Sequence, residues 1–592
     1  MDYQEILEPV AQYRDHLRSE HAENTRQEFE ELLQKSGVDE KLNAEKVKNI
    51  RKLEEAVRKL SNKTALLSFL RGLAIFIAVV SSIMIVLYIL KLFGVMSNVI
   101  SHKWGVTAII AAAVSYTVIF VWLNSLVAKF SKMLQAKQQE LDEALADAWE
   151  QMKPLNELFQ WNTIARIIMK TMPILELDQY FSQSRMNQLI EHFLWCNFED
   201  DTQSILCCQS GAINGNPLVM AESFNQTWGE KTYHGSKTIT WREYDSYEKK
   251  TVTKSETLYA SVTKPIPEYF KEKFLIFGNE AAPDLKFSRS ANELSGAGDG
   301  MMGKLSMRNA IKKLENMSRD LKTDFTIMNN REFDACFNAV DRNNEHQFRL
   351  LFTPLAQQEM LKILQDDSVG YGDDFTFVKC YMINTIVPSH LQQTDISGSP
   401  AIFQNYELAE VRRLFNEYSN DFFRSFFFSI APLLAIPMYQ QHRSTIDIYK
   451  DVYNNGVSFF EYESLANSYA DEQFAPSRAH TPSILKTQLL ERDQDKSRIK
   501  VTAHAFHGED RVEYVPVFGG DNRWHNVPVP WVEYLPISRE RQLTVRAVPG
   551  ETIEESSTAL YSEQYSRYFQ SCGVNYGDLK WRRNLISFFT RN

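Results

Sequence analysis

The chain has 592 residues, a hydrophobic fraction of 44%, a charged fraction of 24% and a net charge of −10. This length predicts two to four domains, and the acidic balance without a basic arm argues against nucleic acid as a partner. The six cysteines form no C-x-x-C pattern, which excludes a zinc-ribbon or dithiol redox motif and favours a reducing compartment.

The N-terminal region, residues 1–70, is expected to form cytosolic helices. Its first residues, MDYQEILEPV, are acidic and lack a hydrophobic core, so no cleaved export peptide is expected. Two uncharged runs then follow at 72–90 and 105–128. A bilayer core requires about 20 apolar helical residues, so the sequence predicts a transmembrane helical hairpin over 71–128.

The charges that flank this hairpin predict its orientation. The connection between the two runs carries only Lys91 and Lys103, whereas many basic residues precede the first run and follow the second. Positive charge favours the cytoplasmic side, so both termini are expected in the cytoplasm. The basic residues outside the connection are Lys46, Lys48, Arg51, Lys52, Arg58, Lys59, Lys63, Arg71, Lys129, Lys132 and Lys137.

Neither run contains Asp, Glu, Lys, Arg or His, one of which a proton relay or pump would normally require. The runs are therefore interpreted as an anchor. Small residues at four-residue spacing allow close helix approach, either within one hairpin or between several copies of the chain. These residues are Ala74, Ala78 and Ser82 in the first run, and Ala108 and Ala112 in the second.

Amphipathic helical patterns flank the hairpin and predict an antiparallel cytosolic stalk of coiled-coil type, which continues over 129–200. Pro154 is expected to break or kink it. Packing between the two faces is favoured over a groove for a partner. The first face comprises Ile50, Leu53, Val57 and Leu60, and the second comprises Leu134, Leu141, Leu145, Ala148 and Met152.

Residues 201–290 are predicted to form an antiparallel β region. In TLYASVT (257–263) apolar and polar residues alternate with the period of a half-buried strand. The segment KTITWREY (237–244) is expected to pair with it through the polar turn DSYEKK, forming a long hairpin.

Residues 304–470 are predicted to form an α+β domain, in which 306–390 is an α+β or β-α-β unit. Thr353 can cap the helix at 353–364, with Pro354 in its first position. The segment SFFFSIAPLLAIPM (425–438) is read as a buried core helix, with contact to the membrane surface as the alternative. The other expected elements are helices at 306–321 and 331–340 and strands at 346–352 and 375–387.

The C-terminal part, residues 484–592, is predicted to be a β region with terminal helices. Residues 471–483 form an expected exposed linker before it, and 519–522 a turn within it. The prolines of VPVPW indicate an edge strand, and the edge near 527–534 could accept a partner strand. The expected strands lie at 498–506, 511–518 and 526–535, and the terminal helices at 554–571 and 577–591.

A glycine-rich stretch at 296–304 raises the possibility of a nucleotide site. Gly298, Gly303 and Lys304 fit G-x-x-x-x-G-K, in which a P-loop lysine and backbone N–H groups hold phosphates. Leu305, however, occupies the position of the required hydroxyl, and no hydrophobic strand precedes the loop. A mobile loop without a cofactor is the favoured interpretation.

Other candidate chemistry is sparse. His504 and His507 could bind a metal with neighbouring carboxylates, but a spacing of three on a strand places them on opposite faces. Asp373 and Asp374 are paired carboxylates without an identifiable companion. No G-x-S-x-G or H-E-x-x-H motif occurs, so no catalytic residue, cofactor or metal is assigned.

Several stretches resemble an uncharacterised family of bacterial two-span membrane proteins. They include GNPLVMAESF, TLYASVTKP, FGNEAAPDLKFSR, DRNNEHQFRLLFTPLAQQEML, LLAIPMYQQH and VEYVPVFGG. The region of about 270–390 also resembles a bacterial domain of unknown function that follows a membrane hairpin. The resemblance implies a bacterial inner-membrane location and a LemA-type membrane protein as a possible partner, but it implies no activity.

The sequence therefore predicts an α+β protein anchored by an N-terminal transmembrane hairpin with a helical stalk. Its expected role is binding or scaffolding at the membrane, through a protein partner or as a homo-oligomer. Two alternatives remain. One is a nucleotide-binding enzyme that uses the 296–304 loop, and the other is an oligomeric channel or transporter component.

Overall fold

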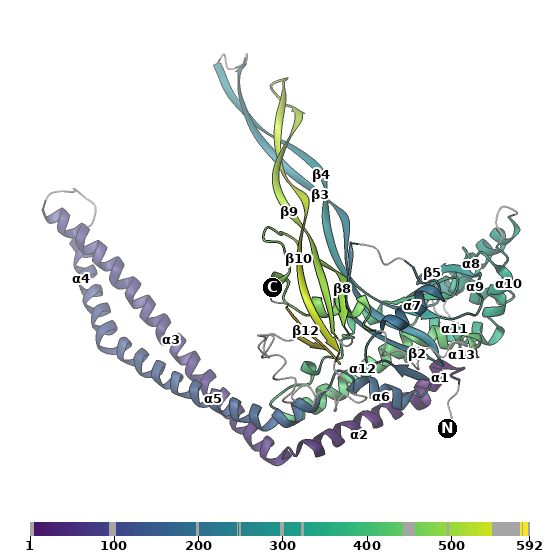
Figure 1. Ribbon diagram of the computed structural model, residues 1–592. Coiled ribbons are helices and arrows are strands. Elements are labelled where there is room, and N and C mark those ends of the chain that lie inside the picture. Colours follow the sequence, from purple (N-terminus) through teal and green to yellow (C-terminus); the bar gives the residue numbers. More distant parts are fainter. Residues whose placement is uncertain are drawn as a thin grey trace. The chain divides into compact units, whose positions relative to one another are not determined.

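The computed structural model describes residues 5–93, 102–196, 201–245, 247, 250–296, 301–320, 325–441, 456–493, 496–547, 580–582 and 584–589. The chain is α+β, with two antiparallel sheets and two long apolar helices near the N-terminus, as the sequence predicts (Figure 1). It divides into two compact units. Unit 1 comprises Met1–Gln27, Gln160–Ser399 and Glu417–Asn592, and unit 2 comprises Glu28–Phe159 and Pro400–Asn416.

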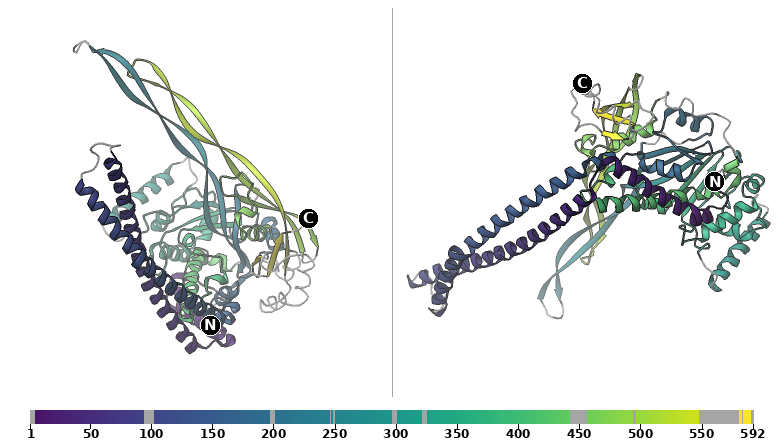
Figure 2. Two further views of the ribbon diagram at one scale, coloured as in Figure 1. Left: turned by 90° about the vertical axis from the view of Figure 1, so that its left-hand side faces the viewer. Right: turned by 90° about the horizontal axis from the view of Figure 1, so that it is seen from below.

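Unit 2 is built on a long antiparallel helix pair. Helix α3 (Glu40–Leu92) runs outward, and the chain returns through α4 (His102–Thr117), the π-helical turn η2 (Val118–Leu123) and α5 (Asn124–Leu158). Figure 2 shows α3 and α5 side by side along much of their length. Unit 2 also contains the end of α2 (Arg18–Ser36) and the start of α12 (Leu408–Leu434).

The stalk half of this pair is held by the two apolar faces that the sequence predicts. Ile50, Leu141 and Ala148 are buried in one cluster, with Leu53, Val57 and Leu145 packed against it. The apolar stripes therefore pack on each other, as expected. The expected break at Pro154 does not occur, because α5 continues past this residue to Leu158.

The outer half of the pair is apolar and exposed. The two helices contain stretches with mean hydropathy 2.9 and 2.2, long and apolar enough to cross a membrane, and only 17% and 29% of these stretches is buried. Small residues make the contact between them, since Ala78, Ala108 and Ala112 are buried. The Ser82 and Tyr116 hydroxyls lie 3.3 Å apart across this contact. The structure therefore shows that these small residues let the two helices of one hairpin pack closely.

The first sheet of unit 1 has seven strands in the order β1-β2-β3-β4-β7-β6-β5, and each neighbouring pair is antiparallel. Its strands are β1 (Leu175–Leu177), β2 (Gln203–Ile213), β3 (Asn216–Asp245), β4 (Lys250–Gly278), β5 (Lys286–Arg289), β6 (Phe375–Cys380) and β7 (Ile383–Pro388). The predicted hairpin at 237–263 is confirmed. It is longer than expected, because β3 and β4 pair continuously from Leu218 opposite Phe277 to Asp245 opposite Lys250.

The second sheet has five antiparallel strands in the order β11-β12-β10-β9-β8. The segments predicted as separate strands at 498–506 and 511–518 belong to one strand, β9. The strands are β8 (Ile484–Asp493), β9 (Lys496–Phe518), β10 (Trp524–Ala547), β11 (Lys580–Arg582) and β12 (Leu585–Phe589).

The β3–β4 and β9–β10 hairpins lie side by side and form a long arm (Figures 1 and 2). A small core of Ile239, Leu258 and Val527 joins them. At Gly235 the backbones approach so closely that a Cβ atom would collide with the carbonyl oxygen of Pro528. The Lys237 ammonium donates to the Asn526 carbonyl nearby. Part of the predicted open edge of 527–534 is therefore covered by the chain itself.

Helices pack around the first sheet in unit 1. Helix α12 carries the predicted core segment, whose aromatic and aliphatic residues are buried, and Thr353 caps α11 as expected. The remaining helices of unit 1 are α1 (Pro9–Gln12), η1 (Tyr13–Leu17), α6 (Thr163–Thr171), α7 (Gln183–Glu191), α8 (Met301–Arg319), α9 (Arg331–Phe337), α10 (Glu345–Leu351), α11 (Pro354–Gln365), η3 (His390–Gln393), α13 (Pro437–Gln441), α14 (Phe459–Asn467) and η6 (Asp471–Gln473), whereas η4 (Pro400–Ile402) belongs to unit 2.

Two predicted elements are wrong in type. Residues 346–352 form most of helix α10 rather than a strand, because Asn344 caps the helix and Phe348 and Leu351 are buried on one face. Residues 580–582 and 585–589 form strands rather than a helix, and β12 pairs with the end of β10. The predicted strand at 375–387 is a hairpin of β6 and β7, which turns at Tyr381. The predicted helix at 554–571 lies outside the described residues.

Candidate functional site

The candidate nucleotide residues lie at the start of α8. Gly298 is outside the described residues, whereas Gly303 and Lys304 fall within the first turn of that helix. A P-loop needs a buried strand that leads directly into its glycine turn. The preceding strand, β5, ends at Arg289 and is the edge strand of an antiparallel sheet. The described geometry around Lys304 thus adds no feature of a phosphate site.

The two candidate metal histidines lie on β9 and have separate surroundings. The Nε2 of His504 is 3.9 Å from a carboxylate oxygen of Asp201. The Nδ1 of His507 is 3.1 Å from the Nδ1 of His480 and 3.0 Å from the Arg478 carbonyl oxygen. Among the described residues, no group of three or more His, Cys, Asp or Glu side chains could hold a metal ion.

The folded chain shows which side chains contact the paired carboxylates Asp373 and Asp374. Asp373 forms a buried ion pair with Arg289, whose Nη2 lies 2.6 and 2.8 Å from its two carboxylate oxygens. Burial lowers the pKa of Arg289, although Asp373 opposes this effect. Asp374 lies 2.6 Å from the Nδ1 of His390.

His390 extends this contact toward α12. Its Nε2 is 3.1 Å from the hydroxyl of Ser429 and 2.9 Å from the Ser425 carbonyl oxygen. The order Asp374, His390, Ser429 has the connectivity of a hydrolase triad. Ser429 is fully buried, however, and its hydroxyl donates to the Ser425 carbonyl within the helix. A substrate cannot reach such a hydroxyl, so the arrangement serves to fix α12 against the sheet.

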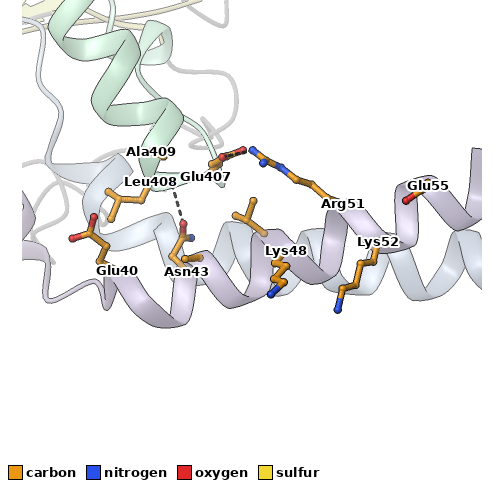
Figure 3. A pocket seen from close by; sticks show the side chains of 11 residues that line it. Glu40, Asn43, Lys48, Arg51, Lys52, Glu55, Glu407, Leu408 and Ala409 are labelled. Carbon is orange, nitrogen blue, oxygen red and sulfur yellow. Dashed lines mark hydrogen bonds and ion pairs between the residues drawn. The ribbon is translucent and has the colours of Figure 1, made fainter.

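A groove in unit 2 is lined by several charged side chains. It has a volume of about 410 Å³ and lies between α3 and the start of α12 (Figure 3). Ala44, Val47 and Leu408 form its apolar floor. The Leu408 backbone N–H donates to the Asn43 side chain at 3.0 Å, which fixes the start of α12 against α3.

Charged side chains surround the groove. Arg51 reaches toward α12 and pairs with Glu407 at 2.6 Å, whereas Lys48 and Lys52 point away from Glu407 (Figure 3). Lys48 and Lys52 are exposed and lie one helical turn apart. The groove therefore combines a small apolar floor with a rim of mixed charge, since Glu40, Glu55 and Glu407 line it beside Lys48, Arg51 and Lys52.

The sequence prediction missed this groove, because its two sides lie more than three hundred residues apart in the chain. One signal was available. Lys41, Lys48, Lys52, Lys59 and Lys63 follow a spacing of 7-4-7-4, which places a basic stripe on one helix face.

A second group missed by the sequence is Lys379, which is buried between β6 and α13. Burial lowers its pKa to about 7. Its ammonium donates to the Tyr381 carbonyl at 2.6 Å and lies over the Tyr439 ring.

Comparisons of the chain with protein-family models, with curated proteins and with solved structures found no match.

Proposed function

We propose that this protein is a membrane-anchored scaffold, in which the apolar ends of α3 and the α4–η2–α5 segment span a bilayer. The stalk then holds the α+β body and its long arm at the cytoplasmic surface. The groove of unit 2 serves as a binding surface on this stalk.

One observation carries the proposal. Large apolar side chains cover the outside of both helices where they are most hydrophobic, with Val79 and Ile83 exposed by 50% and 56%. A soluble protein rarely exposes a continuous apolar surface of this kind. A bilayer would cover it, and the stretches have the length that a bilayer requires.

The flanking residues support the same arrangement. Helix α3 continues without interruption from the charged stalk into the apolar stretch. The small residues between the helices allow the backbones to pack closely. The apolar stretches 72–90 and 105–128 contain none of the Asp, Glu, Lys, Arg or His side chains that a pump would need.

A lysine scan of the exposed apolar face tests the anchor. The combined substitutions Val79→Lys, Ile83→Lys, Ile110→Lys and Val114→Lys change exposed side chains, so a soluble helix pair would tolerate them. In a bilayer each lysine costs about 2.5 to 3.5 kcal/mol. We expect the native chain to resist extraction by alkaline carbonate and the variant to lose most of this resistance.

The matched control places four lysines on the exposed stalk, as Ser61→Lys, Asn62→Lys, Ser131→Lys and Gln135→Lys. This variant should remain as resistant to carbonate as the native chain. Release of the native chain by carbonate, or full resistance of the apolar-face variant, would contradict the anchor.

A further inference from the structure

The outer faces of the two stalk helices carry opposite charges. At 100° per residue, Lys41, Lys48, Lys52 and Lys59 lie within about 20° of the direction opposite the buried Ile50 on α3. All four side chains are exposed. Glu45 and Glu55 lie about 40° from the same direction, and Glu55 pairs with Lys59 at 2.7 Å. The outer face of α3 keeps a net positive charge and is called the basic stripe; it includes Lys48 and Lys52 of the groove in Figure 3.

Helix α5 carries the complementary face. Glu143, Glu150 and Glu157 are exposed and lie within about 40° of the direction opposite the buried Ala148. They recur every seven residues along the helix, and the exposed Lys153, about 40° from the same direction, lies 3.9 Å from Glu150. The outer face over residues 143–157 therefore keeps a net negative charge and is called the acidic stripe. Within one chain the two stripes face away from each other, because the buried faces of α3 and α5 meet between them.

The register of the stalk places the two stripes at the same level. Lys46 of α3 pairs with Asp147 of α5 at 2.7 Å. Heights along the stalk axis follow from this pair and the rise of about 1.5 Å per residue, counted toward the apolar end. On α5, Glu143 lies about 6 Å above the pair; on α3, Lys48 and Lys52 lie about 3 and 9 Å above it. Glu143 of one stalk would thus lie between Lys48 and Lys52 of another stalk at equal height.

We infer that a second copy of this chain docks on the basic stripe of α3 through the acidic stripe of its α5. The inference rests on the proposed function, because a shared bilayer holds neighbouring stalks parallel and at one height. The contact is heterologous, since each copy offers its α5 face to one neighbour and its α3 face to another. Such contacts close into a ring or continue as a row.

Charge reversal tests this contact in the full-length chain in membranes. Lys48→Glu with Lys52→Glu makes both faces acidic, and Glu143→Lys with Glu150→Lys makes both faces basic. Each variant alone should lose association. A mixture of the two should regain it, because opposite faces again meet at every contact. The control Lys312→Glu with Lys313→Glu on α8 should associate like the native chain.

Crosslinking reads out the contact. In a background with serine at the native cysteines, chains with Lys52→Cys and chains with Glu143→Cys are produced together and treated with a short bismaleimide. We expect a crosslinked dimer from the mixture, at least fivefold above either single variant. An equal yield from Lys52→Cys alone, or crosslinks to a different protein, would overturn the inference.

Resistance to carbonate is measured on the same membranes. A resistant chain that yields no dimer would overturn the contact and leave the anchor intact. Release of the chain by carbonate would overturn the anchor. It would also remove the shared bilayer that holds neighbouring stalks at one height, on which the contact depends.

Discussion

The Lys46 ammonium on α3 lies 2.7 Å from the Asp147 carboxylate on α5. This pair joins residues about one hundred positions apart and marks the register of the stalk. Both residues are at the surface, and such an ion pair contributes about 0 to 1 kcal/mol. The register must therefore be held mainly by the apolar contacts beside it.

Replacement of Ile50 by alanine tests this conclusion. Ile50 is fully buried against Leu141 and Ala148, so the cavity should lower the free energy of unfolding of the stalk by about 2 to 5 kcal/mol. Limited proteolysis of α3 in membranes measures the effect. The neighbouring Asn49→Ala is exposed and should leave cleavage unchanged. Equal cleavage of both variants would show that Ile50 carries little of the packing.

The two glycines of β3 form a matched pair for the arm. A Cβ at Gly235 would meet the Pro528 backbone, whereas a Cβ at Gly229 would meet only the end of the flexible Glu268 side chain. Gly235→Ala should therefore separate the hairpins and speed amide exchange at Asn526, Val527 and Val529 at least tenfold. Gly229→Ala should have a much smaller effect. Similar exchange in both variants would contradict the close approach.

The stability of unit 1 should depend on His21. Burial lowers the pKa of this side chain from 6.5 to about 4, and the ring lies 4.0 Å from that of Phe423. The neutral form is favoured in the folded chain, so this stability is present above pH 6.5 and lost as the pH falls toward 4. The loss is roughly 3 kcal/mol, at about 1.4 kcal/mol per pKa unit.

Denaturation of the native chain and of His21→Gln between pH 7 and about pH 4 measures this contribution. The variant should be less stable at pH 7, because the ring contacts are lost, and its stability should fall less on acidification. Parallel pH profiles for the two chains would show that His21 does not drive the acid sensitivity.

The buried pair of Arg289 and Asp373 should be costly to break. Asp373→Asn leaves a guanidinium without its charge partner and should lower stability by about 3 to 5 kcal/mol. The double variant Arg289→Met with Asp373→Asn should lose less than the single variant, because no unpaired charge remains. Thermal unfolding measures both, and a double variant less stable than Asp373→Asn would contradict the account.

Long patterns with one dominant period were predictable from the sequence. The two apolar helices, the stalk faces and the hairpin of β3 and β4 follow directly from helical or alternating periodicity. Short apolar runs were not predictable, because HQFRLLF and LISFF fit either a helix or a strand. Asn344 was the missed signal for the helix, since it caps α10 by accepting from the Gln347 N–H.

Contacts between distant segments explain the rest. Asp374 could not be matched with His390, nor Lys48 with Leu408, because no local pattern links them. The basic stripe on α3 was readable in advance, but its meaning depends on which helix face is buried. Only the packing of Ile50 on α5 shows that the lysines face outward.

The most direct test of the anchored hairpin is the sidedness of single cysteines. Lys103→Cys places a thiol beside the connection between the apolar helices, and the native Cys380 is exposed on the α+β body. In intact cells an impermeant maleimide should label Lys103→Cys, and it should reach Cys380 only after the membrane is opened. Labelling of Cys380 in intact cells, or failure to label Lys103→Cys there, would contradict the account.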